Sequence, residues 1–173
     1  MRPRRARILG LGLAALVFIA DQLVKWLVVG PLDLINLRQI TILPVFNLTF
    51  TENYGVSLGM LTAQSEAMRW GLVGLTGAIA VFVLVWLLRE KALGEIAALA
   101  LVLGGALGNI LDRVSVGYVV DYADLHFGEW RPFLIFNLAD AAITVGVLII
   151  LARAFLSREK RADKEPAEPA SES

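Results

Sequence analysis

The chain has 173 residues, of which 57% are hydrophobic, and its 16 basic and 16 acidic side chains give a formal net charge of zero. This balance gives no indication of a nucleic-acid partner, and we expect none. The absence of cysteine excludes disulfides, cysteine nucleophiles and cysteine-based metal sites. The mean hydropathy is +0.68, and the apolar residues gather in four blocks, which is typical of a polytopic membrane protein.

The first apolar block covers residues 8–30 and follows a short segment rich in arginine. A cleaved signal peptide would begin in the same way. Here, however, the apolar run continues past Asp21 to Gly30 without an obvious small-residue cleavage motif. We therefore expect a retained transmembrane helix at this position.

Three further blocks predict transmembrane helices at about residues 70–88, 92–111 and 133–155. Each block is long enough to cross a hydrocarbon core of about 30 Å at about 1.5 Å per residue. The sequence therefore predicts a mainly α fold with four transmembrane helices, forming a single membrane-embedded domain over residues 1–157.

Basic residues predict the orientation of these helices. They precede the first block, separate the second from the third and follow the fourth, and short cytoplasmic segments are enriched in Lys and Arg. Both ends of the domain should therefore be cytoplasmic, with outer loops at residues 31–69 and 112–132. The charged residues 158–173, with their Pro and Ser, predict a disordered cytoplasmic tail.

The first outer loop contains a segment suited to β-structure. Residues 39–51 are rich in Ile, Val, Thr and Phe, with partial alternation. This pattern predicts short strands. We expect a small β-sheet on the outer membrane surface, between the first and second helices.

Polar side chains gather at the outer ends of the third and fourth predicted helices. An ionisable group within a membrane costs about 2.5 to 3.5 kcal/mol on insertion scales, so each is a functional hypothesis. With helical spacing, the polar side chains on each span lie on one face of that helix. The candidates are Asn109, Asp112 and Arg113 on the third span, Asp121 in the following loop, and Asn137 and Asp140 on the fourth.

Asp121 and Asp140 have apolar neighbours and no adjacent cation. Two carboxylates in such surroundings can share one proton, and can hydrolyse a peptide bond without a metal or other cofactor. Asp112 is followed by Arg113, which suggests that this or another cation keeps it ionised in a supporting role. Each Asp alone could also be a helix cap or part of a packing ion pair, but the convergence of three Asp and two Asn at one rim weakens that interpretation.

Asp21 and Lys25 lie four residues apart within the first predicted helix. This spacing places the two side chains on one face, where they can form an ion pair. We interpret them as a structural polar pair that anchors the helix bundle.

Residues 55–59 match the pattern G-x-S-x-G, which occurs at the nucleophile of serine hydrolases. That chemistry also needs a histidine, and His126 is the single histidine, in a predicted outer loop. There is no H-E-x-x-H motif for zinc. Serine and metal-dependent hydrolysis are therefore disfavoured, and we expect no metal.

Together these motifs resemble those of the lipoprotein signal peptidases, or signal peptidase II, a family of bacterial membrane aspartyl proteases. The resemblance extends over about residues 10–150 and follows the order of the family's motifs. The matching blocks are Asp21-Gln22-x-x-Lys25, Thr51-x-Asn53-x-Gly55, Gly104-Gly105-Ala106-Leu107-Gly108-Asn109-x-x-Asp112-Arg113, Gly117-x-Val119-Val120-Asp121-Tyr122 and Phe136-Asn137-x-Ala139-Asp140.

The resemblance implies that Asp121 and Asp140 form a catalytic dyad, with Asp112 in support. It also implies which residues bind substrate or support the site; these are Asn53, Gly55, Asn109, Arg113 and Asn137. One departure is Ser57-Leu58, where the family usually has Ala-Phe, so the contact of this segment with substrate stays open.

The implied substrates are the signal peptides of diacylglyceryl-modified prolipoproteins, cut just before the lipidated cysteine. The implied location is the bacterial inner membrane, with the active site near its outer, periplasmic face. The family is inhibited by the cyclic peptide globomycin. We expect contact with membrane lipid and a monomeric protein.

Two other functions remain open from the residues alone. A proton-relay transporter or channel component would use intramembrane Asp residues, although it would spread them through the membrane depth and often shows inverted repeats. A purely structural assembly factor would tolerate Asp121→Asn and Asp140→Asn.

Overall fold

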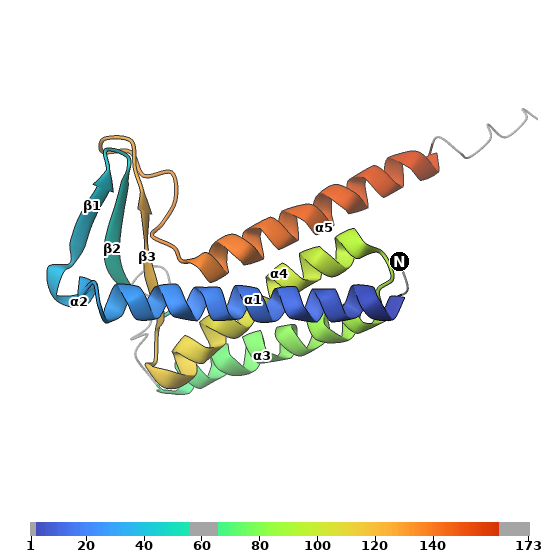
Figure 1. Ribbon diagram of the computed structural model, residues 1–173, viewed down its shortest axis with the longest axis horizontal. Helices are drawn as coiled ribbons and strands as arrows, with labels where there is room; N and C mark the ends of the chain where they lie inside the picture. The colour runs from blue at the N-terminus through green and yellow to red at the C-terminus, as the bar shows by residue number, and fades with distance from the viewer. Residues whose placement is uncertain (1–2, 56–65, 163–173) are drawn as a thin grey trace, which may run out of the picture.

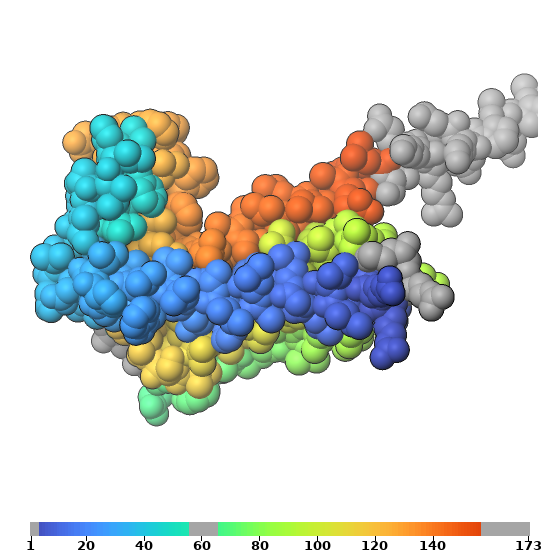
Figure 2. Space-filling view, in the orientation of Figure 1, coloured from blue at the N-terminus to red at the C-terminus, as the bar shows by residue number. Residues whose placement is uncertain are grey.

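The structure of the protein, a computed structural model, describes residues 3–55 and 66–162. Long helices run side by side to form a bundle, and a small β-sheet stands across one end of it (Figure 1). In the space-filling view, α1 runs along the near face of the bundle and the sheet projects beyond it (Figure 2). The segment with Ser57 and Leu58 lies outside the described residues, as does most of the G-x-S-x-G pattern.

Within residues 3–55 and 66–162, four helices are long and apolar enough to cross a membrane. They are α1 (Pro3–Val29), α3 (Glu66–Arg89), α4 (Leu93–Ser115) and α5 (Leu138–Ala162). The predicted mainly α fold with four transmembrane helices is confirmed.

The fourth helix differs most from the predicted bounds. It begins at Leu138 rather than at residue 133, because the preceding residues run alongside the sheet, where the backbone of Phe136 bonds to Ala123. It also continues to Ala162, beyond the expected start of the tail at residue 158. Residues 163–173 of that predicted tail lie outside the described part of the chain.

Helix α4 is the centre of the bundle and packs against α1, α3 and α5. Glycines allow the close approach of α5: a Cβ atom on Gly105 would lie 2.5 Å from the carbonyl oxygen of Ala139, and one on Gly146 would lie 2.6 Å from that of Ala98. Small residues of this kind bring helix backbones together in membranes. This packing fixes the start of α5 against the end of α4.

The sheet is antiparallel with strand order β1-β2-β3. Strands β1 (Gln39–Leu43) and β2 (Phe46–Asn53) arise from the segment predicted to form strands. The third strand, β3 (Val119–Leu125), comes from between α4 and α5, so the prediction of a sheet formed only between the first two spans was incomplete. Almost every residue of β3 is buried, which removes the alternation that indicates a strand.

An apolar cluster attaches the sheet to the bundle. Phe50 of β2 and Val120 and Tyr122 of β3 pack with Val28 at the end of α1 and with Leu34 of the short helix α2 (Leu34–Leu37). The cluster places β3 over the point where α4 ends and α5 begins. Polar residues from all three elements therefore meet at one place.

Candidate active site

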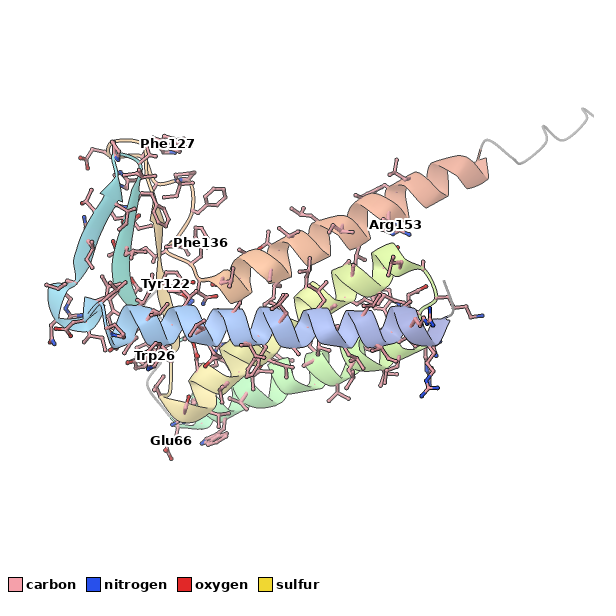
Figure 3. The ribbon with its side chains drawn as sticks, viewed as in Figure 1. Trp26, Glu66, Tyr122, Phe127, Phe136 and Arg153 are labelled. Atoms are coloured by element: carbon pink, nitrogen blue, oxygen red, sulfur yellow. The ribbon has the colours of Figure 1, made fainter. Side chains whose placement is uncertain are left out.

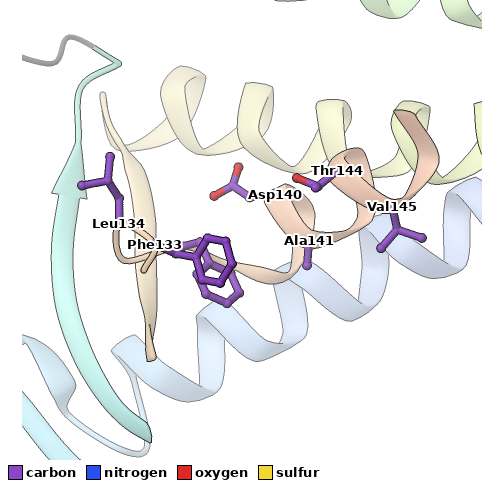
Figure 4. Close-up of a pocket in the computed structure, with 7 residues that line it drawn as sticks. Phe133, Leu134, Asp140, Ala141, Thr144 and Val145 are labelled. Atoms are coloured by element: carbon purple, nitrogen blue, oxygen red, sulfur yellow. The ribbon is translucent and has the colours of Figure 1, made fainter. Parts of the chain in front are cut away.

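The polar residues of the predicted site converge beneath β3. Asp121 lies on β3, so its prediction in a loop was wrong. Asp140 lies in the first turn of α5, and Figure 4 shows its carboxylate between β3 and that helix. Figure 3 places Tyr122 and Phe136 in the same region, between the sheet and the start of α5. The strand and the helix thus present the two carboxylates to a common space.

Asn137 contacts both carboxylates. Its side-chain Nδ2 donates to Oδ1 of Asp121 at 2.7 Å, and its backbone N–H donates to Oδ2 of Asp140 at 3.3 Å. Its Oδ1 also accepts the backbone N–H of Asp140 at 2.9 Å, as a helix N-cap does. Asn137 therefore lies just before α5, rather than within a helix as predicted, and joins the two aspartates.

Each aspartate also accepts a hydrogen bond from a second asparagine. Asn53 Nδ2 donates to Oδ2 of Asp121 at 2.9 Å, and Asn109 Nδ2 donates to Oδ1 of Asp140 at 2.7 Å. The N–H of Gly55 in turn donates to Oδ1 of Asn53 at 2.8 Å. Gly55 has a φ of 79°, a conformation that favours glycine, and this turn orients Asn53 toward Asp121.

Asp121 is almost fully buried, and burial raises its pKa to about 6. The charge of Asp140 contributes to this raised value, whereas the hydrogen bonds from Asn53 and Asn137 oppose the shift. Removal of a carboxylate from water disfavours its ionised form. Asp121 therefore keeps its proton to a higher pH than an exposed aspartate does.

A buried ion network supports the site from α1. Lys25 Nζ lies 2.8 Å from Oδ2 of Asp21 and 2.7 Å from Oδ2 of Asp112, and it donates to Oδ1 of Asn109 at 3.2 Å. The predicted pairing of Asp21 with Lys25 is present in the structure. Asp21 Oδ1 also accepts the backbone N–H of Ala139 at 3.0 Å, so the pair joins α1 to the start of α5.

Asp112 has Lys25 as its ion-pair partner, rather than the adjacent Arg113. It also accepts hydrogen bonds from Gln22 Nε2 at 3.0 Å and from the backbone N–H of Val120 at 3.1 Å. Asp112 therefore connects α4 to both α1 and β3. These contacts account for its supporting position beside the two aspartates.

Arg113 brings positive charge to the site and interacts electrostatically with Asp140, Asp121 and Asp112. Its Nη1 donates to the backbone oxygen of Asn109 at 3.4 Å. Its Nε is buried, and no acceptor for it lies within hydrogen-bond distance among residues 3–55 and 66–162.

Two contributors were missing from the predicted site. Gln22 bonds to Asp112, and the hydroxyl oxygen of Tyr122 accepts the backbone N–H of Leu138 at 3.2 Å. Gln22 could have been found from sequence, because a polar side chain within an apolar span is costly. The bond of Tyr122 depends on the unpredicted strand β3, so no sequence signal indicated it.

An apolar groove of about 310 Å³ opens beside Asp140 (Figure 4). We call it the α5 groove. Its lining residues are Phe133, Leu134, Phe136, Asp140, Ala141, Thr144 and Val145.

Metal-binding side chains do not cluster in the part of the chain that the structure describes: there is no group of three or more His, Asp or Glu residues there that could hold an ion. His126 follows β3, and its backbone N–H donates to the carbonyl oxygen of Val45 at 3.0 Å.

Comparison with known proteins gives consistent results. A family model described as signal peptidase (SPase) II matches residues 13–156. The lipoprotein signal peptidase of Sphingopyxis alaskensis is 54% identical to this chain, covering 91% of this chain and 92% of its own length. That of Rhizorhabdus wittichii is 53% identical, covering 94% of this chain and 92% of its own length. That of Acinetobacter baylyi is 36% identical over 87% of this chain and 84% of its own.

Solved structures share the fold. One described as a bacterial membrane enzyme has a TM-score of 0.70 at 26% identity, covering 92% of this chain and 93% of the other. A second structure with the same description has a TM-score of 0.70 at 30% identity, and covers 84% of this chain and 91% of its own chain. The similarity therefore includes the four helices and the sheet.

Proposed function

The chain belongs to the signal peptidase II family, and we propose that Asp121 and Asp140 are the catalytic pair with which it cleaves lipoprotein signal peptides. The observation that carries this proposal is Asn137, which donates to Asp121 at 2.7 Å and to Asp140 at 3.3 Å. A single buried side chain and its own backbone thus hold both carboxylates. Such pre-organisation is what a water-activating pair requires.

The different environments of the two carboxylates support different roles in this proposal. Asp140 accepts hydrogen bonds from Asn109 and Asn137, and we propose that it takes the proton from the attacking water. Asp121, with its raised pKa, holds the proton and donates it to the carbonyl oxygen of the substrate. Collapse of the tetrahedral intermediate breaks the C–N bond as the leaving amine takes a proton from Asp140, while a hydroxyl group of the intermediate returns its proton to Asp121.

Arg113 is the proposed contact for substrate. Its buried Nε lacks an acceptor among the described residues, and a substrate carbonyl oxygen can supply one. Asn53 and the turn at Gly55 form the wall of the site on the β2 side. We propose that this wall, together with Asn109 and Asn137, holds the peptide across the dyad, while Asp112 supports the site from behind.

The proposed substrates are diacylglyceryl-modified prolipoproteins, cut just before the lipidated cysteine. The proposed setting is the bacterial inner membrane, with both termini of the domain (residues 1–157) cytoplasmic and the sheet on the periplasmic side. The charge pattern supports this orientation, because basic residues collect at the end of the bundle opposite the sheet. We further propose that the protein acts as a monomer among membrane lipids, and that globomycin inhibits it.

The test is to incubate purified protein in lipid with a synthetic diacylglyceryl-modified prolipoprotein and to follow release of the signal peptide. We expect Asp121→Asn and Asp140→Asn each to lose at least about a thousandfold in rate, since the general acid or base is removed. Arg153→Gln is the control, because Arg153 pairs with Glu95 far from the dyad (Figure 3). Retention of cleavage by either Asn variant would contradict the dyad and favour an assembly role.

A further inference from the structure

We propose that the α5 groove holds an acyl chain of the lipid-modified substrate, an inference that rests on the proposed function. The groove begins at Asp140 and continues along α5 to Val145. These residues are separated by about 7.5 Å along the helix axis, at about 1.5 Å per residue. The groove thus leads from a catalytic carboxylate toward the middle of the spanning segment.

The groove opens on the side of α5 that the bundle leaves uncovered. Val145 and Leu148 on α5 are exposed, as are Phe133 and Leu134 on the opposite wall. In a membrane these side chains face lipid, because α5 is one of the four candidate spans. A chain in the bilayer can therefore enter the groove sideways, without crossing the bundle.

The groove has a volume of about 310 Å³, and its lining is apolar apart from Asp140 and Thr144. Such a lining suits the methylene groups of an alkyl chain, which are stabilised when they leave water.

Several backbone groups beside the groove are already used in hydrogen bonds within the protein. The backbone N–H of Phe136 donates to Ala123 at 3.1 Å, and its carbonyl oxygen accepts from Ala123 at 2.8 Å. The first backbone N–H groups of α5 are also used, since those of Leu138, Ala139 and Asp140 donate to Tyr122, Asp21 and Asn137. A peptide backbone left unpaired there would be costly, whereas an acyl chain needs no partner.

The attachment point of the lipid agrees with this location. In the proposed substrate, the lipid is carried by the residue directly after the cleaved bond. Its acyl chains therefore begin close to the dyad, and the α5 groove begins at Asp140. Apolar side chains then line the path away from the carboxylate.

The experiment compares two synthetic substrates that differ only in their diacylglyceryl group, with butyryl or with palmitoyl chains. Val145→Trp fills the groove. We expect it to raise KM for the palmitoyl substrate by at least about tenfold, because several methylene contacts are lost, and to leave cleavage of the butyryl substrate within about twofold of wild type. Val147→Trp is the matched control, since Val147 is exposed on α5 and does not line the groove.

The groove assignment would be overturned if Val145→Trp reduced cleavage of both substrates equally, or if Val145→Trp and Val147→Trp gave the same result. Cleavage by the wild-type protein would still support the proposed function in either case. Failure of the wild-type protein to cleave either substrate would overturn both the groove assignment and the proposed function.

Photo-crosslinking of the wild-type protein gives a test that does not depend on the folding of a variant. A palmitoyl substrate with a terminal diazirine should label residues 133–136 or 141–145. Labelling confined to α1 or α3 would contradict the proposal.

Discussion

The two ends of the helix bundle use the same kind of interaction in different surroundings. At the sheet end, Lys25 and its partners Asp21 and Asp112 are buried, with side-chain exposures of 6% or less. At the other end, Arg153 pairs with Glu95 at 2.7 Å, but their side chains are 41% and 21% exposed. Ion pairs in contact with water contribute little to stability, whereas a buried charge that loses its partner is costly.

This difference indicates where function has shaped the molecule. A membrane bundle can be held together by apolar packing and small residues, as α4 and α5 are near Gly146. Buried charges add desolvation costs that such packing avoids. Their concentration beside Asp121 and Asp140 is explained if they fix the geometry of a reactive pair.

Lys25→Met should have the largest effect on stability. It leaves the carboxylates of Asp21 and Asp112 buried without their shared cation, which typically costs about 3 to 5 kcal/mol. The free energy of unfolding in mixed micelles measures this loss. A loss of less than about 1 kcal/mol in the free energy of unfolding would mean that the buried ion pairs contribute no more to stability than an exposed pair does.

Asn137→Ala tests the link between the carboxylates. It removes the side-chain bonds to Asp121 and to the N–H of Asp140, and we expect a fall in kcat of about a hundredfold or more, as for other pre-organising hydrogen bonds. Single-turnover kinetics on the lipopeptide substrate measure the chemical step. Since Asn47 is also a buried asparagine but lies away from the dyad on β2, Asn47→Ala serves as the control and should retain most of its activity.

The pH dependence of stability tests the environment of Asp121. Its pKa of about 6 lies above the ordinary value of 3.8, so the folded state binds this proton more tightly than the unfolded chain does. The contribution of Asp121 to stability is therefore greatest below about pH 4 and is lost as pH rises through about 6.

Asp121→Asn removes this titration. Relative to wild type, its stability should rise between pH 4 and pH 7 by up to about 3 kcal/mol, at about 1.4 kcal/mol for each pKa unit. Thermal unfolding of both proteins across this range gives the difference. A difference that is constant with pH would show that Asp121 has an ordinary pKa.

Arg153→Gln should have the smallest effect. It removes the partly exposed pair with Glu95, and we expect a change of at most about 1 kcal/mol in the free energy of unfolding. High salt should reduce the difference further, because it screens exposed charges. A loss comparable to that of Lys25→Met would mean that burial does not distinguish the two ends.

The four spans were predictable because continuous hydropathy depends little on tertiary context. Strand β3 was not, since burial on both faces of Val119–Leu125 leaves no alternating pattern. That omission placed Asp121 in a loop and started the last helix too early. The position of Asn137 between the two aspartates could not be predicted either, because it depends on α5 beginning at Leu138.

The residues that meet at the candidate site could be selected by their residue types and by the order of their motifs. Their contacts were not predictable, because Lys25 and Asp112 meet only when α1 packs against α4. Sequence spacing left open whether Arg113 or another cation pairs with Asp112. The packing of the helices provides Lys25 as the partner, and Arg113 interacts electrostatically with Asp140 and Asp121.

The bond between Asp21 and the N–H of Ala139 links an early part of the chain to a late one. During synthesis, α1 emerges from the ribosome long before α5, so this bond and the bridge through Asn137 cannot form until the final helix has entered the membrane. A nascent chain thus carries Asp121 before Asp140 is in place beside it. On the dyad proposed above, hydrolysis then requires the last span to be complete.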